Sequence, residues 1–581
     1  MKRISLIALS LLFLWPVAQA IEPLSPVKGV RNQLAMPQVN IPTMQDARHL
    51  LEETPLPSKT YGPSSSADGL GTYKTTCPTR ISSLNTISET TFPVLLVEFS
   101  DVKFLEISTP DKISRQLNEE NYSDTDYKVG ATSYSSTGSV RDYFLSQSSG
   151  LFSPHFVVVG KVALPQTQAY YFKDSGNNRD VNTYAFINDA ISAAQAQGID
   201  FSAYTINDNP NINGTKTRGV PMLAFICAGY SEASIGYSLY HYSQDESGLD
   251  MPWPHFSRLV NTSGTQYGRA YGNFTLMSYF IGCERFVDTM YQGNVLVMNP
   301  ATVSLAGPGT FVHEFGHALG LPDFYSTDSN VQDAHTPKYW SMMDQGNYYN
   351  MGYNFIGYSA YERILLGWLK YTTLNSTPKQ CTLYPFSAIG QPDTPSDAVF
   401  AYVIKNPLNT KEYYVLENRR ADGLFYPTKM GSGMLVTHVY FDYNKFEANA
   451  LNNDPSVPRY NIIPADGKWQ DGISGNNYKN DLFPGVSGLY TTLTDDSSPQ
   501  NAVCWAGSKK VLQRPLYNIR KDGELIRFDI MKDFAAEGIE TLDAGTSASR
   551  QSVLTFDLQG RPCPSVSRSG IHIQGGRKFI K

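Results

Sequence analysis

Up to about residue 370, short apolar runs along the chain alternate with helical patterns of apolar and polar positions. Two runs, Val94–Phe99 and Met222–Ala228, are continuous and apolar, which predicts strands buried in the interior of a domain. Val140–Leu145 and Asp189–Gln197 carry helical patterns, and Gly198 ends the second one. Strands that alternate with helices predict an α/β (α+β) domain.

Two further helices are predicted before the pattern changes. Thr310 can cap a helix that begins near Phe311 and stops at Gly320. Tyr358–Leu369 reads as an amphipathic helix that contains Gly367.

After about residue 370 the pattern becomes β-like with frequent turns. Tyr413–Glu417 and Met434–Val439 are typical strand segments, and the pattern continues to near Lys532. We therefore expect a β-rich, β-sandwich-like second domain.

The N-terminus has the three parts of a secretory signal peptide. Lys2 and Arg3 are basic, Ile4–Val17 is apolar, and Ala18–Ala20 has small residues on either side of Gln, which predicts cleavage after Ala20. The apolar run is too short for a membrane anchor, and Pro16 interrupts it. The mature protein is therefore expected to be secreted, outside the cytoplasm.

These boundaries divide the chain into five parts. They are a signal peptide (1–20), an N-terminal extension or prosegment rich in Pro, Ser and Thr (21–90), an α/β domain that carries the candidate chemistry described below (91–370), a β-rich domain (371–535), and a linker with a C-terminal tail module (536–581). The tail resembles short C-terminal modules of secreted surface proteins. It is interpreted either as a secretion or surface-anchoring signal or as a small β-module without such a role.

The composition argues against a nucleic-acid partner, a later membrane span and a cysteine-bound metal. The formal net charge is −6 and there is no basic run, so nucleic acid is not expected to bind. No later stretch is apolar and long enough to predict a transmembrane segment. The six cysteines lack the spacing of a metal site: Cys77, Cys227, Cys283, Cys381, Cys504 and Cys563.

The segment His313-Glu314-Phe315-Gly316-His317 carries the chemistry. On a helix, histidines four residues apart share one face, so both imidazoles can reach one ion, and two neutral imidazoles suit zinc (Zn²⁺). Glu314 projects beside the metal, where it can take a proton from metal-bound water and return it to the leaving amine. H-E-x-x-H is therefore read as the site of a zinc peptidase with Glu314 as general base.

A catalytic zinc usually has three protein ligands, and Asp323 is the predicted third. Gly320 can adopt the left-handed conformation that turns the chain, which would bring Asp323 back to the metal. The resulting pattern, H-E-x-x-H-x-x-G-x-x-D, is the metzincin layout with Asp in place of the last His. Downstream, Met343, favoured over Met342, is predicted to form the methionine turn below the metal.

Glu362 is the competing third ligand. Other zinc peptidases take a glutamate from a later helix, and Glu362 lies in such a predicted helix. The alternative is an ion-paired helix residue. The glycine and the methionine turn favour Asp323.

Residues 93 to about 500 resemble the immune inhibitor A-like bacterial metallopeptidases. The matching segments are Leu95–Asp101, Thr137–Phe144, Ser148–Gly150, Ala228–Glu232, Trp253–His255, His313–Tyr325, Glu412–Arg420 and Gly431–Val439. The resemblance implies zinc ligands His313, His317 and Asp323, the base Glu314, and an extracellular endopeptidase that acts on proteins.

The chain departs from this family at a loop that often binds calcium (Ca²⁺). Here the segment Thr205–Gly214 retains a single carboxylate, whereas calcium prefers several carboxylate or carbonyl oxygens. Calcium at this segment is therefore doubtful, although Asn and backbone oxygens could bind it weakly.

Together these features predict a secreted zinc metalloendopeptidase that hydrolyses peptide bonds in extracellular proteins. The alternative is a non-catalytic surface adhesin or binding protein with an inactive peptidase domain. The intact Glu314 argues against that alternative, because an inactive domain has no need of the base.

Overall fold

The computed structural model describes residues 89–536 with internal gaps, followed by short strands between 539 and 580. The gaps are residues 130–131, 176–178, 211–215, 234–249, 260–267, 287–288, 293–294, 299–303, 329–330, 332–334, 422, 469–477 and 506–509. The predicted signal peptide and almost all of the N-terminal extension lie outside the described residues. Among the described helices, none is both long and apolar enough to cross a membrane.

A six-stranded sheet forms the centre of the first part of the chain. Four of its strands are parallel neighbours in the order β11-β7-β1-β4: β1 (Glu89–Glu98), β4 (Ser153–Ala163), β7 (Leu223–Tyr230) and β11 (Ser278–Phe286). On its other side β11 pairs antiparallel with two short strands, β8 (His255–Arg258) and β14 (Ser304–Leu305). The two apolar runs predicted as buried strands lie in β1 and β7, which confirms them.

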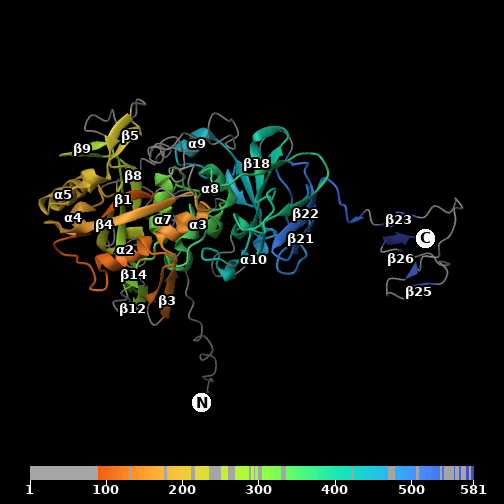
Figure 1. The fold of residues 1–581 in the computed structure, drawn as a ribbon, viewed down its shortest axis with the longest axis horizontal. Helices are drawn as coiled ribbons and strands as arrows, with labels where there is room; N and C mark the ends of the chain where they lie inside the picture. Colours follow the sequence, from red (N-terminus) through yellow and green to blue (C-terminus); the bar gives the residue numbers. More distant parts are fainter. Residues whose placement is uncertain are drawn as a thin grey trace, which may run out of the picture.

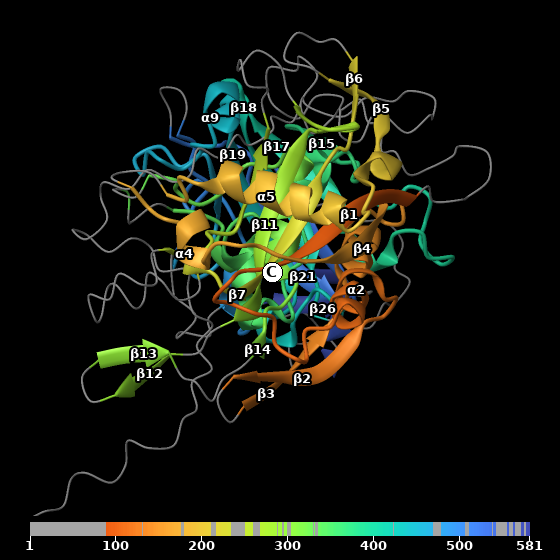
Figure 2. The same cartoon turned by 90° about the vertical axis from the view of Figure 1, so that its left-hand side faces the viewer.

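Helices cover both faces of this sheet. One core contains residues of α2 (Pro110–Asn118), α3 (Val140–Gln147) and α7 (Gly309–Ala318), and the other contains residues of α4 (Gln168–Tyr171) and α5 (Thr183–Ala196). Figure 2 shows α5 in front of the sheet strands. Side chains of β1 alternate between the cores, because successive strand residues point to opposite faces. The first part is thus a three-layer arrangement, and its mixed α/β class confirms the prediction.

Two helix boundaries differ from the prediction. The chain is already helical at Pro308, which occupies the N-cap position of α7, so Thr310 lies inside the helix instead of capping it. The helix predicted over Tyr358–Leu369 is shorter, because α8 (Ala360–Leu365) ends before Gly367, whose φ is +68°. All six residues of α8 are buried, so it is not amphipathic.

Two further sheets form the second part of the chain (Figure 1). The five-stranded sheet has the order β15 (Thr372–Leu374), β17 (Ala401–Asn406), β18 (Asn409–Arg419), β19 (Gly433–Tyr440) and β20 (Tyr460–Ile462). The three-stranded sheet has the order β16 (Lys379–Leu383), β22 (Leu525–Ile530) and β21 (Leu516–Asp522). The predicted strands within β18 and β19 are confirmed, and this part of the chain is rich in β-structure.

The five-stranded sheet contributes side chains to two different cores. In β18, Tyr413 and Val415 belong to the same core as α7 and α8, whereas Tyr414 and Leu416 pack with the three-stranded sheet. The period of two along a strand explains this division. The sheet therefore lies between the α7–α8 region and the three-stranded sheet.

The remaining elements are short. They include the hairpins β2 (Ser123–Val129) with β3 (Thr132–Thr137), β5 (Ile206–Pro210) with β6 (Lys216–Gly219), β9 (Arg269–Tyr271) with β10 (Phe274–Leu276) and β12 (Thr289–Gln292) with β13 (Val295–Met298), the helices α9 (Tyr443–Glu447) and α10 (Tyr478–Asp481), and a C-terminal sheet of β23 (Ile539–Thr541), β27 (Arg577–Ile580), β26 (Ile571–Gln574), β24 (Thr555–Phe556) and β25 (Pro562–Cys563).

Candidate metal centre and active site

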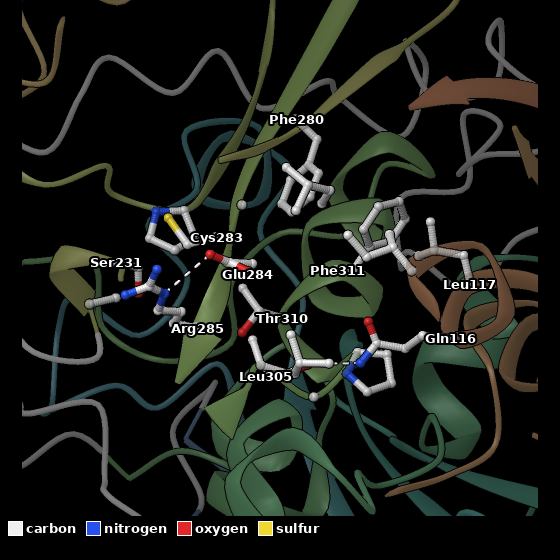
Figure 3. A pocket seen from close by; sticks show the side chains of 18 of the residues that line it. Gln116, Leu117, Ser231, Phe280, Cys283, Glu284, Arg285, Leu305, Thr310 and Phe311 are labelled. Atoms are coloured by element: carbon white, nitrogen blue, oxygen red, sulfur yellow. Dashed lines mark hydrogen bonds and ion pairs between the residues drawn. The ribbon is translucent and has the colours of Figure 1, made fainter. Parts of the chain in front are cut away.

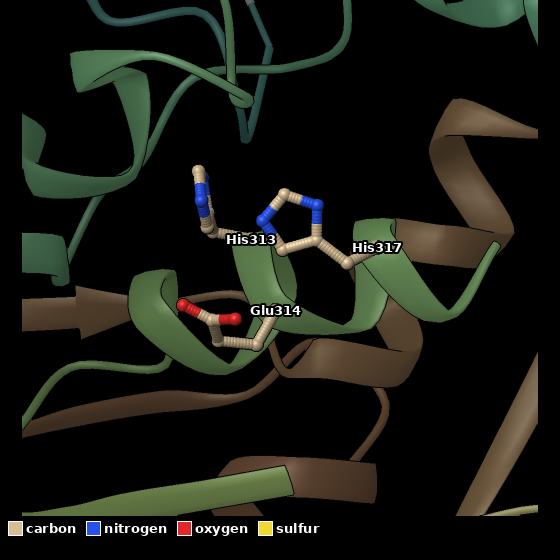
Figure 4. Close-up of side chains that lie close together, drawn as sticks. All are labelled: His313, Glu314 and His317. Atoms are coloured by element: carbon tan, nitrogen blue, oxygen red, sulfur yellow. The ribbon is translucent and has the colours of Figure 1, made fainter. Parts of the chain in front are cut away.

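His313, Glu314 and His317 gather on α7, which is buried along its length. The two imidazoles project from the same side of the helix, with ring centroids 4.9 Å apart (Figure 4). One ligand-capable atom from each of the three residues lies within 4.8 Å of the others. Phe311 and Phe315 of the same helix pack into the core below the sheet, which fixes the face that carries the histidines.

Backbone carbonyls orient both imidazoles. His313 Nδ1 lies 2.8 Å from the Met342 carbonyl, and His317 Nδ1 lies 2.7 Å from the Leu321 carbonyl. A carbonyl oxygen only accepts, so each Nδ1 carries a proton and donates it. In the neutral ring the other nitrogen, Nε2, then carries the lone pair that a metal would bind, and both Nε2 atoms face Asp323.

Asp323 returns to the histidines after a tight turn. Gly320 has a φ of +97°, and its N–H donates to the His317 carbonyl at 2.9 Å, as expected at the end of a helix. Asp323 Oδ1 lies 3.1 Å from His313 Nε2 and 3.3 Å from His317 Nε2. Burial would raise the pKa of Asp323, but the two imidazoles outweigh it and hold this pKa well below its usual range.

Glu314 is held by the neighbouring strand β8. Its Oε2 accepts the backbone N–H of Phe256 at 2.8 Å. Burial raises the pKa of Glu314 to about 8. Without a cation beside it, this carboxyl is therefore largely protonated at neutral pH.

Met343 and Met342 contact α7 in different ways. A Cβ placed on Gly316 would lie 2.5 Å from the sulfur of Met343, so this side chain lies directly against the helix. Met342 contacts His313 through its backbone carbonyl instead. The Met343 carbonyl also accepts the N–H of Phe324 at 2.8 Å, which ties this turn to the segment that carries Asp323.

Glu362 lies on the far side of this methionine turn. Its Oε1 accepts the Ser341 hydroxyl at 2.7 Å and the Met343 N–H at 3.2 Å, while its Oε2 accepts the Ser359 N–H. Both oxygens therefore already have protein donors. In the structure Asp323 lies beside the two histidines, whereas Glu362 hydrogen-bonds residues of the turn.

Two residues close to Asp323 were not predicted from the sequence. Asn449 makes two hydrogen bonds with it and is 126 positions away, so no local spacing could reveal it. The ring of Tyr325 lies 6.5 Å from that of His313, and burial together with the nearby Asp323 carboxylate raises the pKa of its hydroxyl. Tyr325 is inside the matched segment His313–Tyr325, which was a signal for it.

His255 and His438 have hydrogen-bond partners outside this cluster. His255 bonds the Trp253 carbonyl and the Tyr279 hydroxyl, and His438 bonds Glu412 and Asn461. Residues 211–214 of the doubtful calcium segment lie outside the described residues.

A cleft begins beside the first turn of α7 (Figure 3). Ile113, Leu117 and Phe311 form part of its apolar wall, and the Glu284–Arg285 ion pair, with a distance of 3.1 Å between Oε1 and Nε, provides a charged edge. Tyr348 also lines the cleft, and burial together with the nearby Glu314 carboxylate raises its pKa. The cleft therefore lies next to the histidine site.

The fold and this site indicate the class of metallopeptidases, and comparison with known families agrees with this class. Residues 85–364 match the sequence model of the immune inhibitor A peptidase M6 catalytic domain. This match confirms the resemblance drawn from the sequence: residues 85–364 are similar to the catalytic domain of the immune inhibitor A-like metallopeptidases.

The individual relatives are 26–27% identical to this chain over the matched residues. A pre-pro-metalloprotease, PrtV, from two strains of Vibrio cholerae serotype O1 is 27% identical over 218 residues, which cover 36% of this chain and 21% of that protein. Immune inhibitor A from Bacillus thuringiensis subsp. alesti is 26% identical over 271 residues, which cover 44% of this chain and 36% of that protein. The chain therefore matches only about a fifth to a third of the length of these curated relatives.

Proposed function

We propose that this protein is a secreted zinc metalloendopeptidase that hydrolyses peptide bonds in extracellular proteins. The observation that carries the proposal is that Asp323 Oδ1 lies 3.1 Å from His313 Nε2 and 3.3 Å from His317 Nε2, beside Glu314. Two imidazole nitrogens and one carboxylate oxygen are a donor set that suits zinc, and three protein ligands leave one position open for water or substrate. Met343 would form the methionine turn of a metzincin-like site.

When bound, zinc supplies a Lewis acid that activates water at neutral pH and polarises a carbonyl. Glu314 then acts as the base through Oε1, because Oε2 is held by the Phe256 N–H. The pKa of its carboxyl falls when a cation lies beside it, which keeps the base ionised at neutral pH. Glu314 later returns the proton to the leaving amine.

The chain organisation belongs to the same proposal. The Vibrio relative is named a pre-pro-metalloprotease, which supports a signal peptide over 1–20 and a prosegment over 21–90. One core shared by the five-stranded and three-stranded sheets supports a β-sandwich-like domain over 371–535. For the tail, 536–581, we retain a secretion or surface-anchoring signal.

The test is proteolysis of casein by the mature protein, with and without a zinc chelator. Wild type should cleave, chelation should abolish cleavage, and Glu314→Ala should lower the rate by about 10²–10⁴-fold, the usual contribution of general acid–base catalysis. Zinc content of the Glu314→Ala protein is the control, and it should equal that of wild type. A variant that cleaves as fast as wild type would refute the mechanism. Absence of cleavage by the processed wild type would favour the binding-protein alternative.

A further inference from the structure

Three asparagines from the β-rich part of the chain hold the segment that follows α7. Asn453 Oδ1 accepts the N–H of Thr327 at 2.8 Å, and Asn452 Nδ2 donates to the Phe324 carbonyl at 2.7 Å. Asn449 is the third, and it contacts Asp323 itself. All three come after α9, whereas the segment that they hold belongs to the peptidase region.

Asn449 and Asp323 form a reciprocal pair of hydrogen bonds. The Asp323 N–H donates to Asn449 Oδ1 at 2.7 Å, and Asn449 Nδ2 donates to Asp323 Oδ2 at 2.7 Å. The pair fixes both the backbone and the carboxylate plane of Asp323. With Oδ2 bound to the amide, Oδ1 is the oxygen that faces His313 and His317.

The backbone at Asn449 explains why an asparagine occupies this position. Its φ is +51°, directly after the C-cap residue Ala448 of α9, and its N–H donates to the Phe446 carbonyl at 3.1 Å. Glycine and asparagine are the residues that adopt this left-handed conformation most readily. Glycine has no side chain that could reach Asp323. An aspartate at position 449 would have no N–H to donate to the Asp323 carboxylate. An amide accepts from the N–H and donates to the carboxylate at the same time.

We propose that Asn449 is a positioning residue that presents Asp323 Oδ1 to the metal, so that the β-rich part completes the metal site. The inference rests on the proposed function, because it takes Asp323 as a ligand. Asn449 lies outside residues 85–364, the part that matches the family's catalytic domain. Groups that hydrogen-bond a metal ligand from outside typically change metal affinity by about 10–100-fold when mutated.

The test measures zinc affinity of the full-length protein by competition with a chelating dye. Asn449→Asp keeps the size and the acceptor but replaces the donor with a negative charge, and zinc affinity should fall by about 10–100-fold. Asn449→Gly keeps the left-handed backbone, so thermal stability should change little while zinc affinity falls by about 10-fold. In casein cleavage, the zinc concentration for half-maximal activity of Asn449→Gly should rise by the same factor, and excess zinc should restore its rate.

Asn518 offers a matched control. It also has a left-handed backbone, with φ +52°, and its Nδ2 donates to Asp529 and Asp533 at 2.6 and 2.7 Å. It lies in β21, in the three-stranded sheet (Figure 1). Asn518→Asp makes the same chemical change, so it should lower stability and leave zinc affinity unchanged.

The outcomes separate this inference from the proposed function. Wild-type zinc affinity in both Asn449 variants would overturn the positioning role, and so would an equal loss of affinity in Asn518→Asp. A wild type that binds zinc through His313 but does not cleave casein would overturn the proposed function alone. A wild type that binds no zinc would overturn both.

Discussion

The sulfur of Met343 lies against Gly316, in the turn of α7 that separates His313 from His317. A Cβ at position 316 would lie 2.5 Å from this sulfur and 2.9 Å from the hydroxyl oxygen of Tyr358. The helix and the methionine turn thus approach each other at a position where only a hydrogen atom fits.

Gly316→Ala should therefore destabilise the protein, although alanine is the better helix former. Helix propensity alone would raise the free energy of unfolding by about 1 kcal/mol, whereas overpacking a core typically costs about 1–3 kcal/mol. We expect a net loss of about 1 kcal/mol in denaturant unfolding. Adding Met343→Ala should remove most of the penalty of the alanine, which a double-mutant cycle measures. A single variant more stable than wild type would show that the contact is loose.

Asp323→Ala and Glu362→Ala should have different effects. Asp323→Ala should lose bound zinc, because the carboxylate oxygen beside both Nε2 atoms is removed. Glu362→Ala should keep its zinc when folded but lose about 3 kcal/mol of stability, because buried donors of Ser341 and Met343 are left without an acceptor. Metal analysis and denaturant unfolding of both variants check this, and the reverse assignment would make Glu362 the ligand.

Zinc should stabilise the folded protein by mass action. At a free zinc concentration of 100 times Kd, binding to the native state alone raises the free energy of unfolding by about 2.7 kcal/mol. Glu314→Ala should show the same increase, because this residue is proposed as the base and not as a ligand. His313→Ala should show almost none. Thermal unfolding with and without zinc measures the shift, and equal shifts in wild type and His313→Ala would place the zinc elsewhere.

His255 should make stability fall in mild acid. Burial lowers its pKa from 6.5 to about 4. Between these values the unfolded chain binds a proton that the folded protein excludes, so stability decreases as the pH falls from about 6.5 to 4 and is unaffected by this group above 6.5. The loss should total roughly 3 kcal/mol at 1.36 kcal/mol per pH unit. Denaturant unfolding of wild type and His255→Gln across this range should show a shallower pH dependence in the variant.

Local patterns in the sequence were sufficient to predict which residues lie together on α7 and which segments form buried strands. Four-residue spacing determines which helix face carries His313 and His317, and a continuous apolar run identifies a strand covered on both sides. Helix ends were less predictable, because Thr310 is a good cap in isolation while the chain had already become helical at Pro308. Asn449 could not be found, because its role depends on how the second part of the chain packs against the first.

Side chains of β18 alternate between two cores, so the region up to residue 370 and the five-stranded sheet share buried contacts. Tyr413 packs against Tyr361 of α8 with ring centroids 6.2 Å apart, and Tyr460 of β20 packs against the same ring at 5.0 Å. A protein truncated near residue 370 would leave this aromatic face exposed to water. We therefore expect the region up to residue 370 not to fold on its own, and heat should melt it together with the five-stranded sheet in one cooperative transition.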